Sequence, residues 1–131
     1  MALKNNRKLK LLIIDDEQDI CRFEKYIFEK NNFKVYTAQT GTEALRVAKK
    51  VQPDIALIDI HLRKSASGLE ILERLLKIAS NCKCIMASWD REKASEAKKK
   101  GAVGFLIKPT EVKDLVGIVK KAAKMTVKIK R

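Results

Sequence analysis

The amino-acid sequence predicts an α/β protein, built on a parallel sheet with helices on both faces. Short apolar runs alternate strictly with segments that carry apolar residues at helical spacing. These runs are apolar at consecutive positions, which is typical of strands covered on both faces. Two of them, 9–14 and 55–58, end directly before aspartates. The carboxyl ends of parallel strands are where such proteins place their ligand sites.

Five apolar runs are expected to form the strands of this sheet, and polar or glycine residues bound each of them. Because a helical segment separates each run from the next, the strands should be joined by crossovers and lie parallel. In chain order the expected strands are 9–14, 35–38, 55–58, 84–87 and 103–107.

The first helix should begin near Asp19. Its apolar residues recur every three or four positions, so one side of the helix is expected to face the sheet. The residues predicted for that inner side are Ile20, Phe23, Ile27 and Phe28.

The second helix is expected over about residues 42–51. Thr40 or Thr42 is suited to cap it, because a hydroxyl can accept a hydrogen bond from a free N–H of the first turn. Pro53 should enforce the end of this helix, since proline cannot continue the helical hydrogen bonding.

Three further helices complete the alternation. The third should begin after Gly68, and the fourth is a lysine-rich segment over about 91–100. Gly101 is expected to close the fourth helix, because glycine readily adopts the left-handed conformation at helix ends. The fifth helix carries its apolar residues over 112–123.

The length of 131 residues suits a single domain over 1–131 that closes one hydrophobic core. We expect the core of the domain at about 9–124, a basic arm at 1–8 and a basic tail or linker start at 125–131. Apolar residues at 46% and charged residues at 34% exclude a disordered or fibrous chain. No apolar run is long enough to span a bilayer and no signal peptide is visible, so we expect a cytoplasmic protein without a membrane partner.

The three cysteines are expected to be structural thiols. An odd number argues against a disulfide framework, and only Cys82 and Cys84 are close, on one face of a strand. A zinc site would need further thiolate or imidazole ligands, yet His61 is the only histidine.

The net charge of +13 is the compositional oddity. Lysines supply most of it and are spread along almost the whole chain, which favours a solvated surface. A basic surface can also bind nucleic acid by releasing counterions, so this alternative stays open. The densest clusters, 98–100 and 120–131, are not interleaved with the aromatic residues that stack on bases. We therefore expect contact with nucleic acid only indirectly, through another domain.

Acidic residues end two of the expected strands. Asp15 and Asp16 follow the first strand, and Asp59 follows the third. The fold should bring the three carboxylates into one pocket, where they repel one another unless a cation or a proton is present. Oxygen ligands favour a hard ion, and Mg²⁺ is the usual ion where phosphate is handled. The alternative is that these aspartates only cap helices.

Two more groups end the remaining strands beside this pocket. Ser88 ends the fourth strand, and Lys108 ends the fifth. A carboxylate nucleophile, a metal, an ammonium and a hydroxyl together suit phosphoryl transfer to an aspartate. Asp59 would attack, Lys108 would neutralise charge on the transferred oxygens, and the Ser88 hydroxyl would hydrogen-bond the phosphoryl group.

In these motifs the sequence resembles the response-regulator receiver family of two-component signalling over about residues 9–123. The resemblance implies a flavodoxin-like, doubly wound sheet with strand order 2-1-3-4-5. It also implies that Asp15 and Asp16 surround Mg²⁺, and that Asp59 is both metal ligand and phosphoacceptor. The matching stretches are LLIIDDE, TGTEAL, QPDIALIDIHL, GLEIL, CIMAS and GAVGFLIKP.

The same resemblance assigns roles to the other site residues. It implies a metal ligand in the backbone carbonyl of His61, a switch hydroxyl in Ser88 and a switch aromatic in Phe105. Lys108 matches the family's lysine, and its bond to Pro109 is usually cis in the family. The implied phosphodonor is a sensor histidine kinase or a phosphotransfer protein, and the output is a downstream domain or protein. The domain would signal rather than act as an enzyme, while assisting its own phosphorylation and dephosphorylation.

The sequence departs from the family pattern near the site. Arg63 and Lys64 stand where the family usually has a proline, and one residue is inserted before Gly68. Trp89 follows Ser88, where the family prefers a small residue. We expect its indole to point away from the phosphoryl position, into solvent or over the fourth helix.

Other functions compete with a receiver that works alone. The chain could be the receiver half of a truncated DNA-binding regulator or of a hybrid kinase. A hydrolase with an aspartyl-phosphate intermediate needs a second acid, and His61 rather than aspartate stands two positions after Asp59. A direct nucleic-acid binder that uses the basic surface is the remaining alternative.

Overall fold

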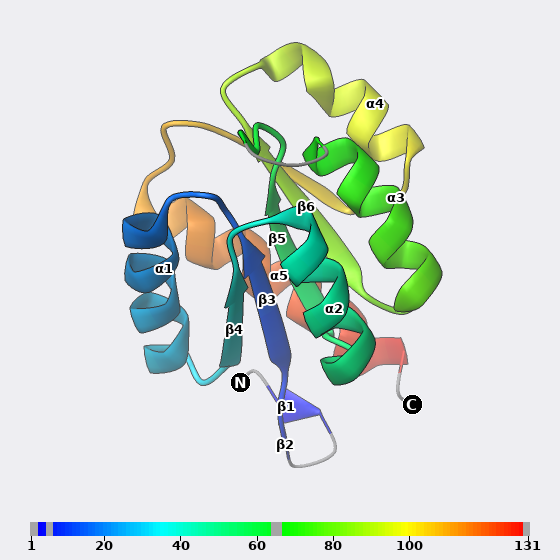
Figure 1. Ribbon diagram of the computed structural model, residues 1–131. Helices are drawn as coiled ribbons and strands as arrows, with labels where there is room; N and C mark the ends of the chain where they lie inside the picture. The colour runs from blue at the N-terminus through cyan, green and yellow to red at the C-terminus, as the bar shows by residue number, and fades with distance from the viewer. Residues whose placement is uncertain (1–2, 5–6, 64–66, 130–131) are drawn as a thin grey trace.

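The computed structural model describes residues 3–4, 7–63 and 67–129, and it confirms the predicted α/β class (Figure 1). Its main sheet has five parallel strands in the order β4-β3-β5-β6-β7. Numbered within this sheet, the order is 2-1-3-4-5, as predicted. The strands are β3 (Lys10–Ile14), β4 (Lys34–Ala38), β5 (Ile55–Asp59), β6 (Lys83–Ser88) and β7 (Gly104–Ile107).

Helices cover both faces of the sheet (Figure 1). One face carries α1 and α5, and the other carries α2, α3 and α4, as the two groups of core residues show. A short 3-10 turn, η1 (Arg91–Lys93), leads into α4. The helices are α1 (Gln18–Lys30), α2 (Gly41–Val51), α3 (Gly68–Ile78), α4 (Ala94–Lys99) and α5 (Val112–Ile129).

Each face of the sheet has its own apolar core, because successive side chains of a strand point to opposite sides. In β3, Leu11 and Ile13 belong to the core under α1 and α5, whereas Leu12 and Ile14 belong to the core under the other helices. All four are at most 1% exposed. The consecutive apolar residues of the strands therefore reflect burial on both faces, as the sequence indicated.

The structure confirms the predicted N-terminal cap of α2 and the predicted glycine after α4. Thr40 caps α2, where its hydroxyl accepts a hydrogen bond from the N–H of Glu43 at 3.1 Å. The Glu43 carboxylate in turn accepts one from the N–H of Gln39 at 2.9 Å. Gly101 follows α4 with a φ of 109°, a left-handed conformation that glycine adopts without strain.

Some details differ from the sequence-based expectation. Phe23 was predicted to face the core but is 52% exposed, because Cys21 and Phe28 occupy the side of α1 that meets the sheet. Helix α4 is shorter than predicted, since 91–93 form a 3-10 turn. Helix α5 continues to Ile129, so the expected tail at 125–131 begins inside a helix.

The basic arm contains structure that the sequence did not indicate. Strand β1 (Leu3–Lys4) pairs antiparallel with β2 (Arg7–Lys8), and β1 contacts α5. This small ribbon lies at the end of the main sheet where the strands begin (Figure 1).

The cysteines are free and buried. The Sγ atoms of Cys82 and Cys84 lie 4.0 Å apart in the core on the α2 side, which confirms that they share a strand face. Within the described ranges, no helix is both long and apolar enough to cross a bilayer.

Candidate phosphoacceptor site

Asp59 ends β5 and lies at the carboxyl edge of the sheet, as predicted. Each of its two carboxylate oxygens interacts with a neighbouring residue. The N–H of His61 donates to Oδ1 at 3.0 Å, and the ammonium of Lys108 lies 3.2 Å from Oδ2. Asp59 is only 7% exposed, so the carboxylate is directed into a pocket and its position is fixed by neighbours from two loops.

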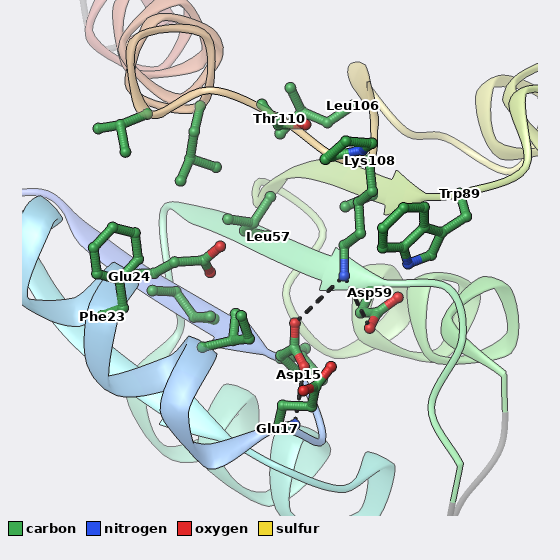
Figure 2. Close-up of a pocket in the computed structure, with 17 residues that line it drawn as sticks. Asp15, Glu17, Phe23, Glu24, Leu57, Asp59, Trp89, Leu106, Lys108 and Thr110 are labelled. Carbon is green, nitrogen blue, oxygen red and sulfur yellow. Dashed lines mark hydrogen bonds and ion pairs between the residues drawn. The ribbon is translucent and has the colours of Figure 1, made fainter.

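Lys108 reaches this pocket from the end of β7. Its own N–H donates to the carbonyl of Ser88 at 2.8 Å, and its bond to Pro109 is cis, as the resemblance implied. The ammonium lies between two carboxylates, 3.6 Å from Oδ2 of Asp15 and close to Asp59 (Figure 2). Burial alone would lower the pKa of Lys108, but the negative charges of Asp59 and Asp15 outweigh it, so the pKa is raised. Lys108 therefore stays protonated.

Asp15 and Asp16 follow β3 and have different environments. Asp15 is 4% exposed, and burial raises its pKa even though its carboxylate accepts a hydrogen bond from the N–H of Glu17 at 2.9 Å. Asp16 lies nearer the surface, where its Oδ2 accepts hydrogen bonds from the backbone N–H and the Nε of Arg63 at 3.1 and 2.9 Å. These bonds outweigh the effect of burial and lower the pKa of Asp16.

The sequence reasoning missed Glu17, although it directly follows the aspartate pair. Carboxylate oxygens of Asp15, Asp16 and Glu17 lie within 4.8 Å of one another. Three oxygen donors at this spacing, with Asp59 on the neighbouring strand, form a donor set of the kind that hard cations such as Mg²⁺ bind. The residues present therefore fit the ion that the sequence predicted.

Ser88 ends β6 and is completely buried. Its hydroxyl oxygen accepts a hydrogen bond from the N–H of Asp90 at 2.9 Å, and it lies 2.8 Å from Nε2 of His61. The resemblance concerned only the backbone carbonyl of His61, so the role of its imidazole was not foreseen. No local pattern signals this contact, because the two residues are 27 positions apart.

Phe105 lies outside the carboxylate cluster. It pairs with Met86 across β7 and β6, and it is half-buried against the core on the α2, α3 and α4 side. The structure thus brings together Asp15, Asp16, Asp59, Lys108, Ser88 and His61, and it places Phe105 next to them in the sheet rather than among them.

A cavity of about 270 Å³ opens beside the carboxylates, between α1 and the start of α5. Trp89 is 66% exposed and lines it, with the indole beside Lys108 (Figure 2). The indole is thus solvent-exposed, as one of the two expected positions requires, but it lines the cavity beside the carboxylates instead of pointing away from it, and it does not lie over α4.

Glu24 is a second residue that the sequence reasoning missed. It occupies the sheet-facing side of α1 and points into the cavity beside Leu57 (Figure 2). Burial raises the pKa of Glu24 to about 7, and the negative charge of Asp15 adds to this. An acid that titrates near neutrality therefore lies within electrostatic range of the phosphoacceptor pocket.

Comparison with known proteins decides the family. The family described as "Response regulator receiver domain" matches residues 11–120, which is most of the chain. The chain belongs to the response regulator receiver family. It is thus a receiver domain of the two-component signalling type, as the motifs indicated.

Two curated relatives match this receiver domain over nearly their whole length. Sporulation initiation phosphotransferase F of Bacillus subtilis is 31% identical over 114 residues, which is 86% of this chain and 91% of the relative. Chemotaxis protein CheY of Listeria monocytogenes is 34% identical over 119 residues, which is 88% of this chain and 99% of the relative.

Solved structures agree with the sequence comparison. A CheY-like response regulator receiver domain protein from Methanospirillum hungatei superposes with a TM-score of 0.86 at 29% identity, covering 92% of this chain and 97% of that one. NtrX from Brucella abortus, in a complex with ATP, gives the same TM-score at 28% identity, but the match covers only 28% of that longer chain. The receiver fold therefore makes up nearly all of the first chain and a smaller part of the second.

Proposed function

We propose that Asp59 of this receiver domain accepts a phosphoryl group from a sensor histidine kinase or a phosphotransfer protein. The observation that carries the proposal is the buried Asp59 carboxylate, which faces the protonated Lys108 next to a group of acidic oxygens. Such a pocket offers a nucleophile, a fixed positive charge and ligands for a hard cation at one place.

In this mechanism Asp59 acts as the nucleophile. A carboxylate oxygen forms the new bond to phosphorus while the bond from phosphorus to the donor's imidazole nitrogen breaks, and the donor keeps that electron pair. The N–H of His61 holds the other oxygen of Asp59 in place. The ammonium of Lys108, 3.2 Å from Oδ2, can follow the transferred oxygens as their negative charge approaches.

Asp15, Asp16 and Asp59 would hold Mg²⁺, with the backbone carbonyl of His61 completing the protein ligands. The ion supplies positive charge that offsets the repulsion between these carboxylates and the incoming phosphoryl group. Glu17 lies close enough to Asp15 and Asp16 to contribute a further oxygen, directly or through water.

After transfer, Ser88 and Phe105 would carry the signal to a downstream domain or protein. The Ser88 hydroxyl would turn to the phosphoryl group on Asp59, and Phe105, which pairs with β6 two positions before Ser88, would follow the change in that strand. The surface that responds is formed by α4, β7 and α5. Loss of the phosphoryl group to water, assisted by the same pocket, would return the domain to its first state.

The receiver domain would comprise residues 1–131 as one unit. Its core corresponds to about 9–124, and the β1–β2 ribbon and the end of α5 are additions at the same end of the sheet. Their contact supports a single unit rather than two independent tails.

Incubation with acetyl phosphate and Mg²⁺, followed by intact mass measurement, tests this function. The mass should rise by one phosphoryl group, and the rise should be absent in Asp59→Asn and in the presence of EDTA. Asp114→Asn, an exposed aspartate of α5, is the matched control and should be phosphorylated normally. Lys108→Ala should fold yet be phosphorylated more slowly, because it keeps the nucleophile and removes the positive charge. An adduct that persists in Asp59→Asn would exclude Asp59 as the acceptor.

A further inference from the structure

Many of the lysines that appear scattered in the sequence lie toward one end of the molecule. All five strands of the main sheet are parallel, so they begin at one edge, and α1, α2 and α3 end near it. Three of the strands begin with a lysine, namely Lys10, Lys34 and Lys83. Strand β2 adds Arg7 and Lys8 at the same edge, and both are exposed (Figure 1).

The helices add positive charge at this edge. Lys30 ends α1, Lys49 and Lys50 lie in the last turn of α2, and Lys77 lies in the last turn of α3. The stretch of α5 from residue 120 onward presents three more exposed lysines. We call this whole surface the basic end; its α5 members are Lys120, Lys121 and Lys124.

Little negative charge balances the basic end. After Asp114 the sequence contains no further aspartate or glutamate. Among the described residues at this edge the acids are Glu29, which is exposed, and Asp54, which is buried and accepts a hydrogen bond from the N–H of Lys10. Lys49, Lys50, Lys77, Lys120, Lys121 and Lys124 form no ion pair with a described acidic side chain.

Interaction with helix dipoles explains only some of the basic residues at this end. A lysine in the last turn stabilises a helix by opposing its negative end, which accounts for Lys30, Lys49, Lys50 and Lys77. That effect fades beyond one turn, and Lys120 and Lys121 lie more than a turn before the end of α5 at Ile129. Arg7 and Lys8 are not in a helix at all. The basic end therefore holds more positive charge than helix stability requires.

We propose that the basic end binds the phosphate backbone of nucleic acid without sequence preference. Closely spaced phosphates hold condensed counterions, and a dense set of unpaired lysines gains free energy by releasing them. An anionic membrane is the weaker match, because membrane-surface helices add large apolar side chains that enter the lipid. Among the α5 residues whose exposure is described, which end at Thr126, Met125 is the one exposed large apolar side chain from Lys120 onward.

The nature of these side chains explains the lack of sequence preference. Base recognition uses planar or amide groups that reach base edges, or aromatic rings that stack on bases. The exposed aromatic residues Phe23, Tyr26 and Trp89 lie on α1 and at the carboxylate pocket instead. The acidic site lies at the opposite end of the strands, so bound nucleic acid leaves Asp59 accessible. Binding therefore does not depend on phosphorylation of Asp59.

Fluorescence anisotropy with labelled DNA duplexes of two unrelated sequences tests the proposal on the full chain. Both duplexes should bind with similar affinity, and the affinity should fall by a factor of at least 10 between roughly 50 and 200 mM salt. The triple variant Lys120→Gln, Lys121→Gln, Lys124→Gln should weaken binding at least ten-fold. It should also reduce the slope of log affinity against log salt by up to about 2.7, since each phosphate contact contributes about 0.9.

A matched control separates the surface from the net charge. Arg22→Gln, Lys93→Gln, Lys113→Gln removes the same charge away from the basic end and should change the affinity less than two-fold. Equal losses in the two triple variants would show that net charge alone is responsible and would overturn the proposal. Failure to bind either duplex at low salt, with or without binding to phosphatidylserine vesicles, would overturn it as well. Circular dichroism confirms that both variants fold.

Discussion

The imidazole Nε2 of His61 lies 2.8 Å from the hydroxyl oxygen of Ser88. This contact joins the loop after β5 to the end of β6, next to the carboxylate of Asp59. The Ser88 oxygen also accepts a hydrogen bond from the N–H of Asp90. In the tautomer whose Nε2 carries no proton, the imidazole accepts the proton of the Ser88 hydroxyl, so in this tautomer His61 and a phosphoryl group on Asp59 compete for that proton.

Removing the imidazole should therefore favour the phosphorylated form. Since one hydrogen bond is worth about 0.5 to 1.5 kcal/mol, His61→Leu should bind beryllofluoride, a stand-in for the phosphoryl group, roughly 2- to 10-fold more tightly. The fluorescence of Trp89, the only tryptophan and the neighbour of Ser88, reports the titration in the presence of Mg²⁺. His61→Gln, which keeps a hydrogen-bonding side chain, should resemble the wild type.

A double-mutant cycle identifies the route of this effect. In a Ser88→Ala background, where no hydroxyl remains, His61→Leu should leave the affinity for beryllofluoride unchanged. An equal gain with and without the hydroxyl would mean that His61 acts elsewhere. Normal phosphorylation by intact mass in the same proteins keeps this outcome separate from a failure of Asp59 as acceptor.

Arg63 should compete with Mg²⁺ for Asp16. Its Nε lies 2.9 Å from Oδ2 of Asp16, and the side chain is otherwise exposed. Arg63→Ala should therefore raise the affinity for Mg²⁺ roughly two- to five-fold, as expected for the loss of one exposed competing pair. Arg46→Ala breaks an exposed pair with Glu43 on α2 and should have no effect. Weaker Mg²⁺ binding in Arg63→Ala would show that the arginine supports the site instead.

Glu24 should make the stability of the protein depend on pH near neutrality. Its pKa is about 7 when folded, against 4.5 for the unperturbed group. Between these values the folded chain keeps a proton that the unfolded chain has released, so the free energy of unfolding falls as pH rises. Relative to Glu24→Gln, the wild type should lose about 1 to 3 kcal/mol between pH 5 and pH 8.

Urea unfolding in EDTA measures this difference. The other charged groups that face Glu24, namely Asp15, Asp59 and Lys108, are present in both proteins, so their titration largely cancels in the comparison. Glu29→Gln changes an exposed glutamate of the same helix and should show no such trend. A pH-independent difference between wild type and Glu24→Gln would contradict the half-buried, protonated state.

Two glycines should respond to alanine in opposite directions. A Cβ on Gly68 would contact the carbonyl oxygen of Asp59 and approach Cα of Ile60 to 2.6 Å, so the phosphoacceptor loop would have to shift. We expect Gly68→Ala to cost about 1 to 3 kcal/mol and to slow phosphorylation. Gly117→Ala, with nothing within 4 Å of its Cβ, should instead stabilise α5 by about 0.5 to 1 kcal/mol. Thermal unfolding of both variants checks the pair.

The sheet and the aspartates were predictable because their signals are local. A buried strand of a parallel sheet is apolar at every position, and Asp15 and Asp59 directly follow such runs, so strand order alone brings them together. The family motifs then predicted which other residues, such as Ser88 and Lys108, lie beside these aspartates. These features require only short stretches of sequence and one rule about where parallel strands end.

The remaining features depend on contacts that no local pattern records. The His61 imidazole contacts Ser88 across two loops. Glu24 interrupts an apolar stripe, and helical spacing alone cannot distinguish a solvent-facing polar residue from a half-buried acid. The end of α5 was placed too early, because 124–129 contain neither the glycine nor the proline that usually marks a helix end. The β1–β2 ribbon is too short to have a strand period of its own.

The carboxylate pocket and the basic end lie at opposite ends of the same strands, which gives the molecule a permanent electric dipole along the strand direction. Two copies thus present complementary ends to each other, and such a head-to-tail contact does not close on itself. At low ionic strength the copies should align into short stacks, with the basic end of one over the acidic pocket of the next. Since charges are screened beyond about 8 Å at physiological salt, the stacks should dissolve there. A polyanion bound at the basic end would stop further copies from adding there, and Mg²⁺ bound in the pocket would stop addition at the other end of the stack.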